Sequence, residues 1–119
     1  MPTTIEIANV RDLSPPSEWP EWYVYVGRGN KQRGFKASPL KNLFEVGIYG
    51  DRQSCIDAFR EALLDAAWQP KSHAGRMAFN ELARLRALLA DHGKLVLVCW
   101  CAPKRCHAEV IKEVLEEPR

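Results

Sequence analysis

The stretch that decides the predicted fold is Lys94-Leu-Val-Leu-Val-Cys-Trp-Cys-Ala-Pro-Lys-Arg-Cys-His-Ala-Glu-Val-Ile-Lys-Glu-Val-Leu-Glu116. Its first part, Leu95 to Trp100, is a short apolar run rich in β-branched residues, which predicts a buried strand. Its last part has apolar residues at the spacing of an amphipathic helix: Val110, Ile111, Val114 and Leu115. The connection between the two carries thiols, an imidazole and two cations. In open α/β sheets, ligands bind at the edge where strands pass into helices.

Two further strands are predicted upstream of this stretch. Apolar and polar residues alternate from Thr4 to Val10, and an apolar, aromatic run extends from Trp22 to Val26. Between them, residues 11–21 are rich in proline and predict a stiff surface loop. A short apolar piece from Val46 to Tyr49 is expected to be either another strand or a turn docked on the core.

Two further helices are predicted in the middle of the chain. The first starts with Asp51 as its N-cap and keeps an apolar stripe to about Trp68. The second extends from about Arg76 to Asp91, and Gly93 follows as the residue that ends it.

The order of these elements predicts an α/β fold. We expect a single domain over residues 1–119, Rossmann-like in general shape, with a short, mostly parallel sheet flanked by about three helices. A chain of 119 residues with 46% hydrophobic residues can form one core without disulfides.

The composition narrows the classes of function. The net charge of +2 provides no general basic field, so nucleic acid is not favoured as a partner. No apolar run reaches the roughly 18 residues of a membrane span, and no signal-peptide pattern is present at Met1. We therefore expect a cytoplasmic protein with reduced thiols. In that setting, the four cysteines are expected to be metal ligands, reactive thiols or core residues rather than disulfides.

Several segments resemble the family called domain of unknown function 4326: Tyr25-Val-Gly-Arg28, Asn42-Leu-Phe44, Arg52 and Cys99-Trp-Cys-Ala-Pro-Lys-Arg-Cys-His107. Members show a strand ending in Ile/Val-Gly-Arg, a basic loop leading to Asn-Pro-Phe, a helix, and a Cys-x-Cys segment followed by Pro and Cys-His. This chain has Leu43 where the family usually has proline. The resemblance covers about Tyr23 to Leu115 and implies a compact α/β fold without an established activity. The strand, Cys-His and helix ending is also similar to the uncharacterised α/β family numbered 488.

Cationic and polar residues are predicted to meet at the carboxyl edge of the sheet. Lys104 and Arg105 flank the start of the last helix, where backbone N–H groups and the helix dipole favour anions. Arg28 follows another strand, Arg52 starts another helix, and Asn42 offers a donor and an acceptor. We therefore expect a pocket for a phosphorylated or nucleotide-derived small molecule, bound by Arg28, Asn42, Arg52, Cys101, Lys104 and Arg105. The alternative is a solvated turn at residues 104–105 and a structural ion pair at Arg28.

Thiol chemistry at the last helix is a further expectation. A cysteine at a helix N-terminus beside cations and a histidine is favoured as a thiolate, so Cys106 is a candidate catalytic nucleophile. Cys101 could serve as its resolving partner, and His107 is a candidate catalytic acid or base. The alternative for His107 is a capping or packing role. Cys55 and Cys99 are expected to be buried core residues.

Zinc is the other chemistry considered for this segment, because Cys99, Cys101, Cys106 and His107 are all zinc-ligand types. Their spacing is unlike common zinc motifs, and adjacent residues in a first helical turn point about 100° apart. We therefore expect no metal cofactor. The alternative function is a non-catalytic interaction module that is stabilised by zinc or sequesters a ligand.

Overall fold

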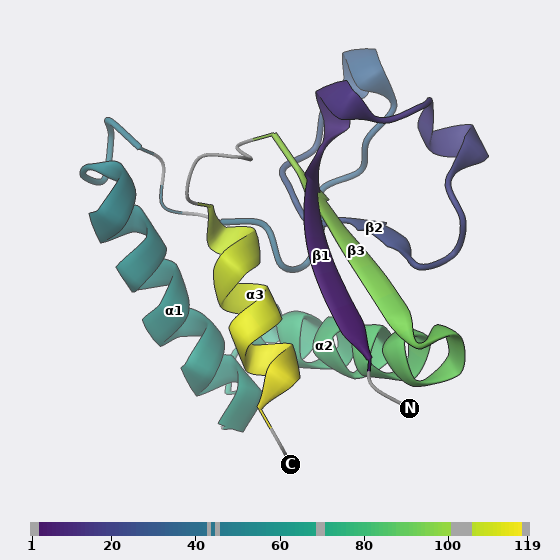
Figure 1. Ribbon diagram of the computed structural model, residues 1–119. Coiled ribbons are helices and arrows are strands. Elements are labelled where there is room, and N and C mark those ends of the chain that lie inside the picture. The colour runs from purple at the N-terminus through teal and green to yellow at the C-terminus, as the bar shows by residue number, and fades with distance from the viewer. Residues whose placement is uncertain (1–2, 43, 45, 69–70, 101–105, 118–119) are drawn as a thin grey trace.

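The computed structural model describes residues 3–42, 44, 46–68, 71–100 and 106–117. Its described elements are β1 (Thr4–Asn9), β2 (Tyr23–Tyr25), α1 (Arg52–Trp68), α2 (His73–His92), β3 (Lys94–Cys99) and α3 (His107–Glu116), shown in Figure 1. Three short 3-10 helices lie in the loops: Val10–Asp12, Pro16–Glu18 and Lys31–Arg33. The prediction of a small α/β domain with a parallel sheet and three helices is confirmed.

The sheet has the strand order β1-β3-β2, and both of its pairings are parallel. Ile5 lies opposite Leu95 on one side of β3, and Val24 lies opposite Leu97 on the other. The central strand is buried from Leu95 to Cys99, as expected for a parallel strand that is covered on both faces. Because the strands are parallel, their carboxyl ends lie at one edge of the sheet.

The two faces of the sheet are covered differently. Leu95, Leu97 and Cys99 belong to the core that includes the apolar residues of all three helices. The opposite face packs against strand and loop residues, many of them aromatic: Val10, Phe35, Leu13, Trp19, Trp22, Tyr23, Tyr25 and Trp100. A Rossmann-like sheet carries helices on both faces. The described residues do not confirm that arrangement, so the Rossmann-like shape stays a prediction.

The helix ends follow the predicted capping residues. Asp51 caps α1 by accepting a 2.8 Å hydrogen bond from the Ser54 N–H, and Gly93 ends α2 with a φ of 73°. α2 begins earlier than predicted, at His73, because the Ser72 side chain caps it through the Gly75 N–H at 2.9 Å. The signal missed was this serine, which is a favoured N-cap residue.

The segment from Val46 to Tyr49 is a turn, and it is not docked on the core. Val46 is 52% exposed, Ile48 81% and Tyr49 57%. Val46 and Gly50 form an isolated bridge, with Gly47 at a φ of 89° between them. The apolar pattern alone could not distinguish a buried strand from an exposed apolar turn.

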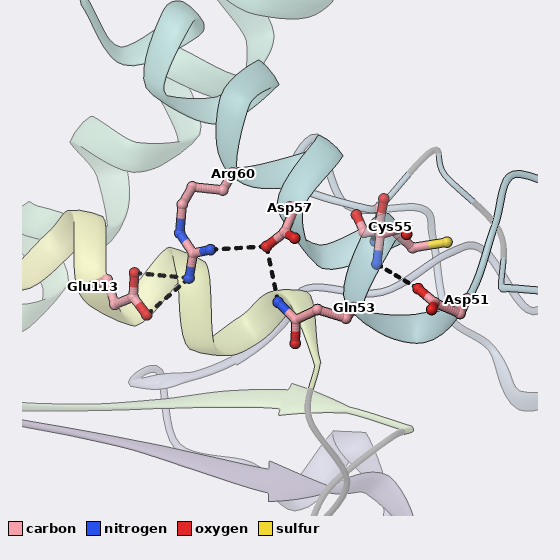
Figure 2. A network of polar contacts seen from close by, with 8 residues as sticks. Asp51, Gln53, Cys55, Asp57, Arg60 and Glu113 are labelled. Atoms are coloured by element: carbon pink, nitrogen blue, oxygen red, sulfur yellow. Dashed lines mark hydrogen bonds and ion pairs between the residues drawn. The ribbon is translucent and has the colours of Figure 1, made fainter.

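Helices α1 and α3 lie side by side and begin at the same end of the molecule, near the carboxyl edge of the sheet (Figure 1). Arg60 on α1 joins them, since its Nη2 donates to both carboxylate oxygens of Glu113 at 3.2 Å (Figure 2). Asp57 accepts from Arg60 at 3.3 Å and from Gln53 at 2.8 Å. This partly exposed network helps to keep both helix starts at one edge.

Within the described part of the chain, no helix is both long enough and apolar enough to cross a membrane.

Candidate functional site

A cavity of about 360 Å³ lies at the carboxyl edge of the sheet. Its described walls come from the ends of β2 and β3, the loop before α1, and the starts of α1 and α3: Gly27, Arg28, Asn42, Phe44, Val46, Arg52, Cys55, Ile56, Cys99, Trp100, Cys106 and His107. The volume is in the range of small-molecule sites. The position agrees with the rule that ligands of open α/β sheets bind outside the carboxyl ends of the strands.

Most of the predicted site residues line this cavity. The structure brings together Arg28, Asn42, Arg52, Cys106 and His107, which come from separate segments of the sequence. The predictions for Cys101, Lys104 and Arg105 lie outside the described residues.

Sequence reasoning missed the apolar wall of the cavity, formed by Phe44, Val46, Ile56 and Trp100. It assigned Cys55 and Cys99 to the core, and both are 1% exposed, yet both also line the cavity. The positions of two wall residues in the sequence could have indicated them. Phe44 closely follows Asn42, and Trp100 directly follows a predicted strand.

Arg28 is held at the cavity through its side chain and through its own carbonyl oxygen. Its Nε and Nη2 donate to the Asn42 carbonyl oxygen at 3.0 and 2.9 Å. Its own carbonyl accepts from the Tyr25 hydroxyl at 2.6 Å, and that hydroxyl accepts from the Trp100 indole at 2.9 Å. Gly27 permits this arrangement, because a Cβ there would lie 2.6 Å from the Tyr25 hydroxyl oxygen. The guanidinium plane is therefore fixed by its surroundings.

Asn42 positions the loop before α1. Its side-chain oxygen accepts from the Phe44 N–H at 2.9 Å, and its side-chain nitrogen donates to the Cys55 carbonyl at 3.4 Å. Both polar atoms of the side chain thus contact the protein backbone, while the main-chain oxygen holds Arg28. The geometry gives Asn42 a positioning role.

Arg52 supplies the second cation from the first residue of α1. It follows Asp51, whose N-cap hydrogen bonds from the Ser54 backbone and side chain lower the pKa of its carboxyl. Arg52 is partly buried and lines the cavity together with Arg28. The described lining residues include these two arginines, and no aspartate or glutamate is among them.

His107 is buried, with 8% of its surface exposed, and its ring is fixed by the sheet. Its Nε2 lies 2.7 Å from the Val26 carbonyl oxygen. A carbonyl can only accept, so Nε2 carries the proton and Nδ1 has the lone pair. Burial is the main cause that lowers the pKa of the imidazole, and the positive charge of Arg28 lowers this pKa further. The hydrogen bond to Val26 acts in the opposite direction. The ring is therefore a neutral base at pH 7.

Cys106 lies directly beside that base. Its Sγ is 3.4 Å from the His107 Nδ1, and it is 3% exposed. The two side chains were expected to point apart as neighbours in a first helical turn, and this was wrong. Cys106 is the N-cap and has an extended backbone, with φ −149° and ψ 158°, so the helical angle does not apply. The Glu109 carboxylate accepts from the Cys106 N–H at 3.0 Å and completes the cap.

Within the described ranges, no group of three or more His, Cys, Asp or Glu side chains is arranged to hold a metal ion. Cys55, Cys99 and Cys106 are thiols rather than disulfides. The remaining predicted ligand, Cys101, lies outside the described residues.

A family model described as Domain of unknown function (DUF4326) matches residues 13–117. No curated protein and no solved structure matches the chain. The match spans most of the sequence and includes the resemblance on Gly27-Arg28, Asn42 and the Cys106-His107 pair. The chain therefore belongs to the DUF4326 family.

Proposed function

We propose that the protein binds a phosphorylated or nucleotide-derived small molecule in this cavity, with Arg28 and Arg52 as the contacts of the anionic group. One observation carries the proposal: two guanidinium groups from separate segments of the sequence line a single cavity. Arginine is the cation best suited to phosphate, because its planar fork of N–H donors can pair with two oxygens.

The shape of the wall supports a ligand with an apolar part as well as an anionic one. Phe44, Val46, Ile56 and Trp100 form the apolar side of the cavity. An aromatic or sugar ring could pack there while the phosphate contacts the arginines, as in sites that combine apolar walls with a few placed polar groups. A cytoplasmic location goes with this proposal, because the thiols suit a reducing compartment.

The start of α3 contributes less to anion binding than the sequence indicated. The N–H of its N-cap residue, Cys106, already donates to the Glu109 carboxylate. That carboxylate also offsets part of the positive end of the helix dipole. The proposal therefore depends on the arginine side chains more than on the helix terminus.

Thermal unfolding of the full chain with and without ligand tests the proposal. The probes are AMP, ribose 5-phosphate and inorganic phosphate, each compared where possible with its unphosphorylated partner, adenosine or ribose. At a concentration about 100 times Kd, one-site binding stabilises the folded state by about 2.7 kcal/mol, which raises Tm by several degrees. Arg28→Ala and Arg52→Ala should each abolish that rise.

Arg76→Ala is the matched control, because Arg76 is an exposed arginine on α2 that does not line the cavity. It should respond to the probes as the natural protein does. The proposal fails if no phosphorylated probe raises Tm, or if the Arg28→Ala and Arg52→Ala proteins respond as strongly as the Arg76→Ala protein.

A further inference from the structure

The pair formed by Cys106 and His107 lies in the wall of the cavity beside Arg28. We infer that Cys106 is a nucleophile activated by His107, and that it attacks the carbonyl carbon of an acyl group on the anion held by Arg28 and Arg52. The anionic part of this substrate rests on the proposed function, and the acyl part follows from the chemistry of a thiol nucleophile, which forms thioesters with acyl carbons. The activation of the thiol rests on neither.

The geometry has the order of nucleophile, base and orienting group. The Cys106 Sγ lies 3.4 Å from the His107 Nδ1, and the His107 Nε2 lies 2.7 Å from the Val26 carbonyl oxygen. In cysteine and serine nucleophile sites, the third group fixes the tautomer of the base. Here a main-chain carbonyl takes that role, and it is rigid because Val26 is fully buried and its N–H donates to the Val98 carbonyl at 3.0 Å.

The imidazole is prepared to take a proton at the nitrogen that faces sulfur. Since Nε2 keeps its proton for Val26, the lone pair of Nδ1 is directed at Cys106. Phe59 packs edge-on against the same ring, with the centroids 5.1 Å apart, and prevents it from turning. A buried, neutral and fixed imidazole is the state that a general base requires.

Charged groups around the thiol come from several elements. Arg28 follows β2 and Arg52 starts α1, and both line the cavity. Glu109 lies on the same helix as Cys106 and contacts its N–H. Cys55 on α1 and Cys99 on β3 are the other titratable groups of the described wall. The two cations favour the thiolate, and the carboxylate of Glu109 partly offsets them.

The proposed reaction balances without an oxidant or a reductant. The thiol proton moves to Nδ1, sulfur forms a bond to the carbonyl carbon, and the π electrons move to the carbonyl oxygen. Collapse of this adduct breaks the bond to the leaving group, which takes the proton from the imidazolium. Water then cleaves the thioester, which restores the thiol and releases a carboxylic acid.

Alkylation of the full chain with uncharged iodoacetamide, followed by peptide mass spectrometry, tests the activation of the thiol. Cys55 and Cys99 serve as internal controls, because they line the same cavity and are each 1% exposed against 3% for Cys106. Cys106 should react faster than both by about 100-fold, the lower range of general-base assistance. Equal rates for the three thiols in the natural protein would overturn the inference.

His107→Gln separates the base from the orienting contact. Glutamine can still donate to the Val26 carbonyl, but it has no basic nitrogen facing Cys106. The reaction of Cys106 should slow to the rate of the control cysteines, while circular dichroism reports an unchanged fold. An unchanged rate for Cys106 in a folded His107→Gln protein would show that His107 does not activate the thiol.

Acetyl phosphate tests the substrate class, because it joins a phosphate to an electrophilic acyl carbon. We expect an acetyl adduct on Cys106 that is absent in His107→Gln and strongly reduced in Arg28→Ala. If inorganic phosphate raises Tm but Cys106 is not acetylated, the inference fails and the proposed function stands. If Cys106 is acetylated as fast in Arg28→Ala as in the natural protein, the proposed binding of the anion by Arg28 is refuted, while the activation of the thiol by His107 stands.

Discussion

Acidification is expected to destabilise the folded protein through His107. Burial is the main reason why the pKa of this imidazole is lowered from its ordinary 6.5, and the charge of Arg28 adds to it against the hydrogen bond to Val26. The unfolded chain exposes the ring, so its pKa returns to about 6.5. Between the folded pKa and 6.5, the unfolded state binds a proton that the folded state does not bind.

The sign and size of the effect follow from that difference. The stability contributed by the neutral ring is complete above pH 6.5 and decreases as the pH falls toward the folded pKa. Within this window, the free energy of unfolding should fall by up to about 1.4 kcal/mol per pH unit. Below the folded pKa, both states carry the proton and the loss becomes constant.

Urea unfolding of the natural protein and of His107→Gln, from about pH 8 to about pH 5, measures this effect in the range where histidine titrates. Glutamine keeps a donor for the Val26 carbonyl but does not titrate. His73, His92 and the carboxylates are present in both proteins, so their effects cancel in the difference. The difference between the two free energies should shrink as the pH falls. Parallel curves over the whole range would refute the assignment of a buried neutral imidazole.

Four substitutions test the packing and capping that position the site, each by urea unfolding. Leu97→Ala should cost about 2 to 5 kcal/mol, because this side chain is fully buried in the central strand, and a loss below about 1 kcal/mol would contradict that packing. Gly93→Ala should lower the free energy of unfolding by about 1 kcal/mol. The cause is backbone strain at positive φ and not a clash, because a Cβ there has no neighbour within 4 Å. An unchanged stability would argue against the left-handed end of α2. Ser72→Ala should cost about 1 kcal/mol through loss of the α2 N-cap, with Ser72→Asp restoring most of it. Arg60→Ala should cost less than about 1 kcal/mol, because its ion pairs are partly exposed, and the cost should diminish further in high salt.

The parts of the fold that local patterns specify were predictable. The apolar run at Leu95 gives the buried central strand, and the periodic residues around Ile111 give α3. Asp51 marks the start of α1 because its side chain accepts a hydrogen bond from the backbone of the first turn. Gly93 marks the end of α2 because its backbone adopts positive φ without strain. Each of these signals depends on residues close in sequence, and short-range physics is sufficient to interpret them.

The site was predictable as a group of residues but not as an arrangement of atoms. The Val26 carbonyl is a backbone acceptor, and no side-chain pattern identifies it as the partner of His107. The contact between Cys106 and His107 requires an extended N-cap, whereas helical geometry would separate them. The side chain of Asn42 bonds to the backbone of Phe44 and Cys55, contacts that depend on loop geometry and that no local pattern indicates.

Strand order is the long-range property that turns these residues into a site. Tyr25 pairs with Val98, so the chain leaving β2 at Val26 and Arg28 lies beside the end of β3 and the start of α3. If β2 paired with the outer edge of β1 instead, it would lie on the other side of β3, at two strand spacings of about 4.8 Å each instead of one. Val26 could not then reach His107. The local sequence of β2 would be the same in both cases, so its neighbours in the sheet, and not its own pattern, place Arg28 in the cavity.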